Sequence, residues 1–318
     1  MPKVSVVIAV YNVEPYIERC LHSLFGQTLD EIEYIFVDDS STDSSIKIIN
    51  KTLEAYPCRK VLTKILHHCS NLGVGAARTT GIKAATGDYI IHCDPDDYIE
   101  VNMYEKLYSH AIETDADIVA CYYWKEQQSQ KEVVRINYSP TPQECLKNLY
   151  KKKHHCGHLW NKLVRRSLIL SYDIFPFEKI DLAEDLNSMI RIYYWARTIS
   201  VVEEPLYHYC IREKSLTTSD SYRRNFRTRV ENVNRICAFL KQTGDHRYDT
   251  LCNYLKYFLK FDFRDFFTDD HEWFDWYREC HKDVMKYYDN SLKSRIILWI
   301  VLQNYTIYKF AKRIIHNL

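Results

Sequence analysis

Apolar runs alternate with helix-period segments through the first 120 residues. Residues 4–10 are β-branched and almost continuously apolar, which is typical of a strand covered on both faces. Six further segments continue the alternation, with strands predicted at 32–37, 61–67 and 89–93 and helices at 15–24, 41–55 and 75–85. This strand–helix order predicts an α/β fold with a doubly wound, mostly parallel sheet flanked by helices.

The second half of the chain has a different pattern. Residues 118–124 predict another strand, and the charged stretch 125–131 is interpreted as a loop or hairpin. From residue 221 onward the sequence is helical in period, rich in Tyr and Phe, and almost devoid of Gly and Pro. We therefore predict an α/β domain over 1–220 and a helical C-terminal region over 221–318.

Composition narrows the class of protein. Lys plus Arg number 43 and Asp plus Glu 42, so no global field attracts nucleic acid, and no nucleic-acid partner is expected. The eleven cysteines are odd in number, contain no CxxC pair and follow no signal-peptide pattern, which predicts reduced thiols in a cytoplasm. No window approaches the ~18 uncharged apolar residues that span a bilayer. The protein is expected to be cytoplasmic, or to lie on a membrane without crossing it.

Two acidic motifs follow predicted strands. Asp94 and Asp96 come directly after strand 89–93, whose end is marked by Pro95. Ligands of such sheets bind outside the carboxyl ends of the strands. Two carboxylates at this spacing suit Mg²⁺ or Mn²⁺, which prefer oxygen ligands and neutralise a departing diphosphate. The alternative is a solvated acidic turn.

Two other segments have both a binding and a structural interpretation. Asp38 and Asp39 follow the second strand, where an acid can accept hydrogen bonds from a base or ribose, or can cap the next helix. In the segment 71–81, glycines permit close backbone approach, and Arg78 is placed to face a diphosphate. Tight helix–sheet packing, with Arg78 holding a buried acid, is the alternative there.

Taken together, four segments resemble the motifs of family-2 glycosyltransferases in order and spacing, namely 4–12 (VSVVIAVYN), 37–43 (VDDSSTD), 71–78 (NLGVGAAR) and 93–98 (CDPDDY). The resemblance covers about residues 1–215. It implies a GT-A fold and a metal-dependent, inverting transfer of a sugar from a nucleotide-sugar. Thr79 and Ser40 depart from the Asn and Gly common in the family, which blurs inference about the donor.

The resemblance also implies roles on the donor side. Tyr11 and Asp39 resemble residues that hold the base, usually uracil. Asp94 and Asp96 match the metal-binding pair, with Asp94 also suited to the ribose or diphosphate, and Arg78 matches a position near the nucleotide.

Further matching residues lie near residue 208. In this segment His208 and Arg212 resemble a late loop that covers the diphosphate, although a solvated basic loop is an alternative.

On the acceptor side, inverting transfer needs a base that removes a proton from the acceptor hydroxyl. Glu184 and Asp185 precede the helical run 186–195, where acids also serve as ordinary N-terminal caps. The resemblance implies that Asp185 is the catalytic base and that Glu184 orients it or the acceptor. Trp160 is either an acceptor-stacking residue or a core residue, and His158 is expected to contribute to the same pocket.

The hypothesis is an inverting glycosyltransferase that transfers from a UDP-linked donor to a glycan or lipid-linked acceptor in bacterial cell-surface polysaccharide assembly. One alternative is a non-catalytic nucleotide-sugar-binding scaffold. Another is a sugar-1-phosphate nucleotidylyltransferase, which needs a Gly- and basic-rich loop where residues 11–14 read Tyr-Asn-Val-Glu. Residues 221–318 are assigned to acceptor, membrane or oligomer contacts. Segment 296–315 suits an interfacial helix on the inner face of the cytoplasmic membrane, or a docked terminal helix.

Overall fold

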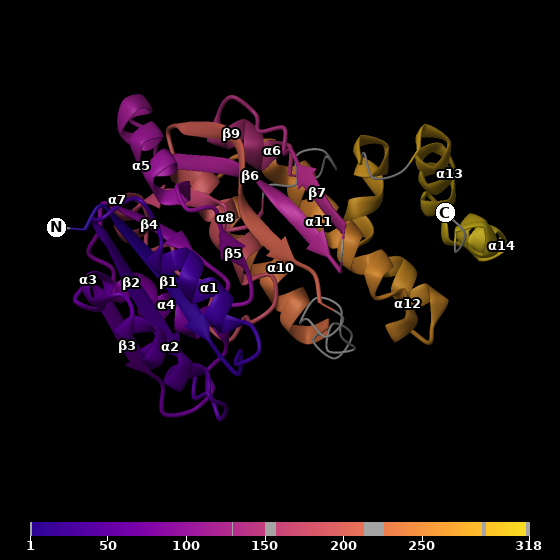
Figure 1. The fold of residues 1–318 in the computed structure, drawn as a ribbon. Coiled ribbons are helices and arrows are strands. Elements are labelled where there is room, and N and C mark those ends of the chain that lie inside the picture. Colours follow the sequence, from indigo (N-terminus) through magenta and orange to yellow (C-terminus); the bar gives the residue numbers. More distant parts are fainter. Residues whose placement is uncertain (1, 129, 150–156, 213–225, 288–290, 316–318) are drawn as a thin grey trace.

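The computed structural model describes residues 2–128, 130–149, 157–212, 226–287 and 291–315. The predicted boundary near residue 220 lies outside these described residues. Figure 1 shows a strand-rich N-terminal part that continues into a series of helices, which end in α13 and α14. Among the residues that the structure describes, no helix combines the length and apolar character needed to cross a membrane.

A single sheet organises the N-terminal part. Its strands are β1 (Val4–Val10), β2 (Ile32–Asp38), β3 (Thr63–His67), β4 (Tyr89–His92), β5 (Tyr98–Ile99), β6 (Ile118–Gln127), β7 (Gln130–Val134), β8 (Lys162–Arg165) and β9 (Ile199–Cys210). Their order is β3-β2-β1-β4-β8-β6-β9-β5, with β7 paired to β6. Strands β3, β2, β1 and β4 are parallel, as are β6 and β9. Strand β8 runs antiparallel to β4 and β6, and β5 and β7 are antiparallel additions, so the sheet is mixed.

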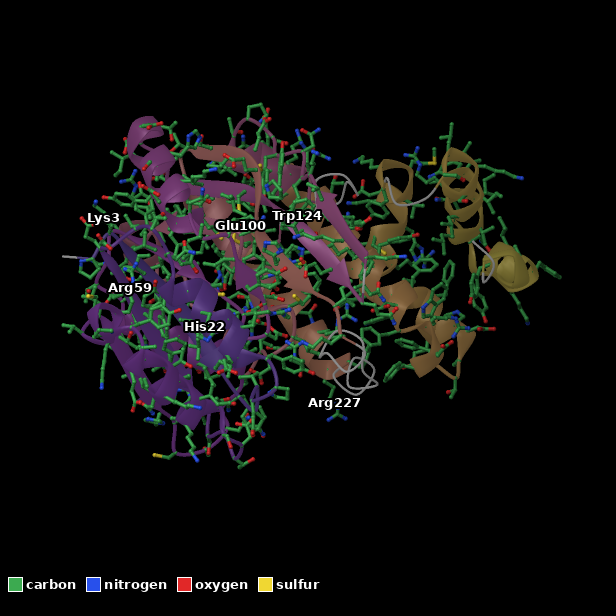
Figure 2. All side chains as sticks on the ribbon, in the orientation of Figure 1. Lys3, His22, Arg59, Glu100, Trp124 and Arg227 are labelled. Carbon is green, nitrogen blue, oxygen red and sulfur yellow. The ribbon has the colours of Figure 1, made fainter. Side chains whose placement is uncertain are left out.

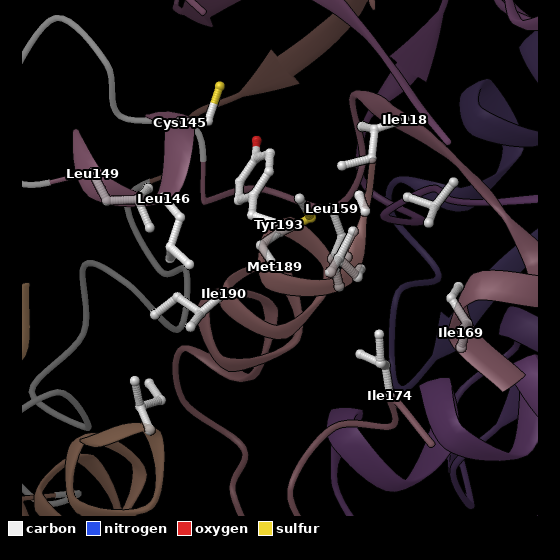
Figure 3. Packing of buried hydrophobic residues seen from close by; sticks show 14 of the residues in the cluster. Ile118, Cys145, Leu146, Leu149, Leu159, Ile169, Ile174, Met189, Ile190 and Tyr193 are labelled. Atoms are coloured by element: carbon white, nitrogen blue, oxygen red, sulfur yellow. The ribbon is translucent and has the colours of Figure 1, made fainter. Parts of the chain in front are cut away.

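Helices cover both faces of this sheet. They are α1 (Ile17–Phe25), α2 (Ser45–Glu54), α3 (Pro57–Lys60), α4 (Val74–Ala84), α5 (Met103–Thr114), α6 (Pro142–Lys147), α7 (Arg166–Ser171) and α8 (Glu184–Trp195). Alternate residues of β1 point to opposite faces. Val4, Val6 and Ile8 pack into a core with α1, α2 and α5. Val7 packs into a second core that contains α4, α7 and α8, part of which is shown in Figure 3.

The C-terminal region is helical, as predicted. It contains α10 (Phe226–Gln242), η2 (His246–Tyr248), α11 (Asp249–Asp262), η3 (Arg264–Phe266), α12 (Asp270–Asp275), η4 (Arg278–Lys286), α13 (Leu292–Leu302) and α14 (Tyr305–Ile315). Helices α10 and α11 join the core around α8, whereas the later elements form a separate aromatic-rich cluster. The predicted helical segment 296–315 is divided between α13 and α14.

The predicted elements agree closely with the observed ones. Strand β1 has the predicted bounds, and the described residues of the stretch 125–131 belong to the β6–β7 hairpin, in which Gln127 pairs with Gln130. Strand β3 begins two residues later than predicted, because Pro57 starts the short helix α3 and Val61 lies 86% exposed beyond it. Helix α4 packs closely on β1, since a Cβ added to Gly81 would lie 2.4 Å from Val7 Cγ1.

A buried carboxylate fastens the edge of the sheet at the amino ends of β1 and β4. Glu33 accepts hydrogen bonds from Ser5 Oγ (2.6 Å), Lys64 Nζ (2.9 Å) and the backbone amides of Thr86 and Gly87. Burial opposes ionisation of Glu33, but these hydrogen bonds outweigh it and lower its pKa to about 2. The ionised side chain therefore ties β2 to β1 and to the turn before β4.

We expect Glu33→Gln to lower the free energy of unfolding at pH 7 by about 1–3 kcal/mol, because it removes hydrogen bonds to a charged acceptor. The folded-state pKa is depressed below its ordinary value of 4.5, so the stabilisation is present above pH 4.5 and is lost as the pH falls toward about 2. Urea midpoints should show the wild-type advantage shrinking over that window. The exposed control Glu54→Gln should show no such trend, and a pH-independent difference for Glu33→Gln would contradict the expectation.

Candidate functional site

Three of the candidate donor-site residues lie at one edge of the sheet, because β2, β1 and β4 are adjacent parallel strands. Tyr11 follows β1, Asp39 follows β2 and Asp94 follows β4. The amide of Asp39 donates to the carbonyl of Val10 (2.9 Å), which holds the two strand ends together. Tyr11 is 48% exposed, whereas Asp39 is buried. The three residues therefore lie just beyond the carboxyl ends of adjacent strands, as the sequence predicted.

Asp39 anchors the loop that precedes α4. Its carboxylate accepts the amides of Leu72 (2.9 Å) and Gly73 (2.8 Å), and it also contacts Nδ1 of His68 (2.7 Å). Gly73 has φ +91°, a left-handed conformation that glycine adopts readily. A Cβ there would lie 2.0 Å from Oδ1 of Asp181, so the loop also packs against the segment that leads to α8. In this structure Asp39 thus fixes the loop before α4 against the end of β2.

Arg78 joins the donor-side and acceptor-side acids. From α4, its buried guanidinium donates to Oε1 of Glu184 (2.5 Å) and to Oδ1 of Asp94 (3.0 Å). Burial alone would lower the pKa of Arg78, but the two carboxylates outweigh burial and raise it. Arg78 therefore remains charged, and it holds the buried acid Glu184 as well as the partly exposed Asp94.

Glu184 and Asp185 occupy the first turn of α8 in contrasting environments. Burial raises the pKa of Glu184, although Arg78 opposes the shift. Asp185 accepts the amide of Leu186 (2.7 Å), and its Oδ2 lies 3.8 Å from Nδ1 of His158. Burial opposes ionisation of Asp185, but the interaction with His158 and the positive charge of Arg78 lower its pKa. Asp185 is thus the member of the pair that stays ionised at neutral pH.

His158 forms the solvent-facing end of an aromatic stack. Its ring lies 4.9 Å from the ring of Trp160 at 20°, and Trp160 in turn stacks on Tyr207 at 4.3 Å. Trp160 is only 4% exposed, whereas the His158 side chain is 28% exposed. Lys162 donates to the carbonyl of His158 (2.6 Å) and fixes this part of the chain. The stack therefore places the ring of His158 beside Asp185, and the buried ring of Trp160 packs against the ring of His158.

The second acid of the motif faces a basic wall. Asp96 forms an ion pair with Arg212, whose guanidinium lies 3.7 Å from the ring centroid of Tyr16. Arg19 donates to the backbone carbonyl of Asp96 (3.1 Å) and to Sγ of Cys210 (3.1 Å). Tyr16, Arg19, Cys210 and Arg212 line a hollow of about 730 Å³, together with Pro15, Glu18 and His22. Arg19 carries no signal in the sequence, because it belongs to an ordinary helical pattern with no motif around it.

His208 contacts a different pair of acidic residues. Its Nδ1 contacts Oε1 of Glu126 (2.8 Å), its Nε2 contacts Oε1 of Glu100 (3.0 Å), and its ring stacks on Tyr98 at 3.9 Å. Figure 2 shows Glu100 and Trp124, another ring neighbour, on this part of the sheet.

The neighbouring Tyr207 points to the other side of β9. Its hydroxyl donates to the buried carboxyl of Asp97 (2.7 Å), because successive strand residues alternate in direction. Among the described residues, His208 forms no hydrogen bond or ion pair with Asp94 or Asp96. The structure therefore brings Arg212, and not His208, to the acidic motif.

The chemistry of the acidic motif fits a hard divalent cation. The side chains of Asp94 and Asp96 are 31% and 30% exposed, and both offer carboxylate oxygens. Among the described residues, no group of three or more His, Cys, Asp or Glu side chains is arranged to hold a metal ion. A cation here would therefore need further ligands from the bound molecule, which is how Mg²⁺ commonly binds together with phosphates.

Comparisons with known proteins agree with these features. A sequence model described as glycosyl transferase family 2 matches residues 5–172, which is more than half of the chain. The chain is 38% identical over 221 residues to the putative glycosyltransferase EpsH of Bacillus subtilis, covering 68% of this chain and 62% of that protein. It is 30% identical over 272 residues to the cholesterol galactosyltransferase of Borreliella burgdorferi, covering 81% and 73%. The chain thus spans about 62% of the length of EpsH.

Solved structures share the fold. S. aureus TarS residues 1–349 in complex with UDP has a TM-score of 0.66 and 21% identity, covering 96% of this chain and 88% of that one. The same TarS segment in complex with UDP-GlcNAc matches equally well. A mannosyltransferase from Pyrobaculum calidifontis in complex with GDP-Man and Mn²⁺ has a TM-score of 0.57 at 15% identity, covering 99% of this chain and 83% of that one. At these identities the likeness shows the GT-A fold alone, but together with the sequence matches it establishes that the chain belongs to glycosyl transferase family 2.

Proposed function

We propose that the protein is an inverting glycosyltransferase that moves a sugar from a UDP-linked donor to a glycan or lipid-linked acceptor in bacterial cell-surface polysaccharide assembly. The observation that carries the proposal is the contact of Arg78 with both Asp94 and Glu184. It joins the strand-end acid to the helix that carries Asp185. The proposed nucleotide-binding residues at the strand ends and the proposed base, Asp185, therefore belong to one site.

On the donor side, Tyr11 and Asp39 are proposed to form the base and ribose end of the site. Arg78 and Arg212 supply positive charge near Asp94 and Asp96, where a departing diphosphate needs it. His208 is proposed to act indirectly, without contacting the diphosphate. It fixes the end of β9 through Glu100 and Glu126, and thereby the start of the segment that carries Arg212.

Asp94 and Asp96 are proposed to hold Mn²⁺ or Mg²⁺. When bound, the cation would help to neutralise the diphosphate. In this structure Arg78 forms an ion pair with Asp94, and Arg212 forms one with Asp96. When the donor and cation bind, each arginine must share its carboxylate with the cation or move to the diphosphate.

On the acceptor side, Asp185 is proposed to take the proton of the attacking hydroxyl. Its lowered pKa keeps it ionised at neutral pH. Glu184 is held by Arg78 and orients the start of α8, whereas His158 contacts the acceptor or stabilises the charge on Asp185. Because Trp160 is buried, its contribution to the acceptor pocket is to support the ring of His158.

We expect Asp96→Ala to weaken Mn²⁺-dependent UDP binding by at least about 10–100-fold, because even indirect metal contacts are worth this much. Isothermal titration with UDP, with and without Mn²⁺, measures the effect. The control Asp30→Ala removes a carboxylate that is 95% exposed and should leave binding unchanged. Equal UDP affinity in all variants, with no dependence on metal, would contradict the metal assignment.

The same assays separate the alternative functions. A scaffold would bind the nucleotide-sugar but would give neither transfer nor metal-dependent hydrolysis of the donor. A nucleotidylyltransferase would consume UTP and release pyrophosphate. Positioned acids at 94, 96 and 185 favour the transferase over both.

We also propose a cytoplasmic location, with residues 221–318 available for acceptor or membrane contacts or for homo-oligomer formation.

A further inference from the structure

Helix α13 is apolar on two opposite faces. Leu298, Val301 and Leu302 are buried in the C-terminal aromatic cluster. The outward stripe consists of four exposed residues, Leu292 (59%), Ile296 (42%), Trp299 (43%) and Ile300 (47%). Their spacing of four, three and one places them on one side of the helix. A surface helix ordinarily carries polar residues on its outer face, so this stripe calls for a partner.

Helix α14 also exposes apolar side chains. Tyr308 is buried against the same cluster, whereas Ile307 is 43% and Phe310 85% exposed. Figure 1 shows α13 and α14 at the end of the molecule opposite β3 and α2. We call the six exposed apolar residues of the two helices the α13–α14 face, defined by Leu292, Ile296, Trp299, Ile300, Ile307 and Phe310.

The positive charge of this part of the chain indicates which kind of partner covers the α13–α14 face. Residues 290–318 contain no Asp or Glu, but they contain five basic residues, Lys293, Arg295, Lys309, Lys312 and Arg313. A second copy of the chain would bring like charges together. An anionic lipid surface instead complements the charge, and a half-exposed Trp favours the interfacial region of a bilayer.

We propose that the α13–α14 face docks on an anionic lipid surface. Each helix has eleven residues, too few to span a bilayer, so the contact is interfacial. Exposed apolar side chains enter the boundary of the acyl chains, while the exposed side chains of Lys293 and Lys309 meet the headgroups. The inference is independent of the transfer reaction, although a lipid-linked acceptor would be found at the same surface.

Vesicle co-sedimentation of the full chain tests the proposal. Binding is expected to vesicles of phosphatidylcholine with phosphatidylglycerol, and to weaken with added salt. Vesicles of phosphatidylcholine alone should bind far less. The double variant Trp299→Ser/Ile300→Ser is expected to lower association with the anionic vesicles by about tenfold, because it removes two apolar side chains from the contact. The matched control Ile112→Ser alters a residue that is 58% exposed on α5 and should bind as wild type does.

Three outcomes would overturn the proposal. They are absence of vesicle binding, equal binding to neutral and anionic vesicles, and a concentration-dependent dimer that the double variant abolishes. Circular dichroism of the variants guards against misfolding. Titration with UDP should be unchanged in the double variant, so failure of lipid binding is distinguishable from failure of the transferase proposal.

Discussion

Replacing Asp185 by Asn should lower kcat for sugar transfer by about 10²–10⁴-fold, the range that a positioned general base contributes. The substitution keeps the shape of the side chain and an oxygen that can accept the amide of Leu186. It removes the negative charge that would receive the proton of the acceptor. Binding of UDP should change little, because Asp94 and Asp96 are untouched.

Transfer assays at saturating donor, paired with titration of UDP, measure the two effects separately. The control Asp30→Asn should transfer at the wild-type rate, since that side chain is 95% exposed. The lowered pKa of Asp185 also predicts a sign for the pH dependence. Wild-type activity should persist as the pH falls below neutrality and decline only as Asp185 becomes protonated. Transfer by Asp185→Asn at the wild-type rate would eliminate Asp185 as the base.

Arg78→Met should cost about 3–5 kcal/mol of folding free energy, as expected when a buried ion pair loses one partner. The change leaves Glu184 buried without its counter-charge and frees Asp94. Since burial already raises the pKa of Glu184, the deficit should shrink at acidic pH, where this carboxyl takes up a proton. Transfer should also fall, because both the donor and acceptor acids lose their common contact.

Urea unfolding at pH 7 and pH 5 measures this effect. Arg227→Met is the matched control, because Arg227 is exposed near the start of α10 (Figure 2). Arg78→Lys should be intermediate, since an ammonium group keeps the charge but lacks the planar fork that spans two carboxylates. If Arg78→Met unfolded like the wild type, Arg78 would not be the bridge on which the proposed site depends.

Local pattern was enough to predict the strand-end geometry. The apolar runs before Asp39 and Asp94 form β2 and β4, which pair in parallel with β1 on either side, so all three carboxyl ends lie at one edge. The helix that carries Arg78 follows from the same periodicity. Each of these inferences depends on residues close together in the sequence, which is why they could be made without coordinates.

Long-range partners could not be predicted in this way. Arg78 and Glu184 are 106 positions apart, and nothing near either residue specifies the pairing. His208 and Arg212 come from one short segment, but strand alternation and the end of β9 direct them to different partners. The antiparallel β8 pairs only a few residues with β4 and β6, too short a pattern to distinguish from a loop. Trp160 packs against residues distant in the sequence, among them Tyr123 and Tyr207, the latter 47 positions later.

The left-handed turn at Gly73 has a consequence for how far this site tolerates change. Its amide is held by Asp39, and the space where a side chain would stand is filled by Asp181. A methyl group there would overlap the carboxylate of Asp181, at a φ that residues with side chains rarely adopt. The loop before α4 and the segment before α8 can therefore lie this close together only because position 73 has no side chain.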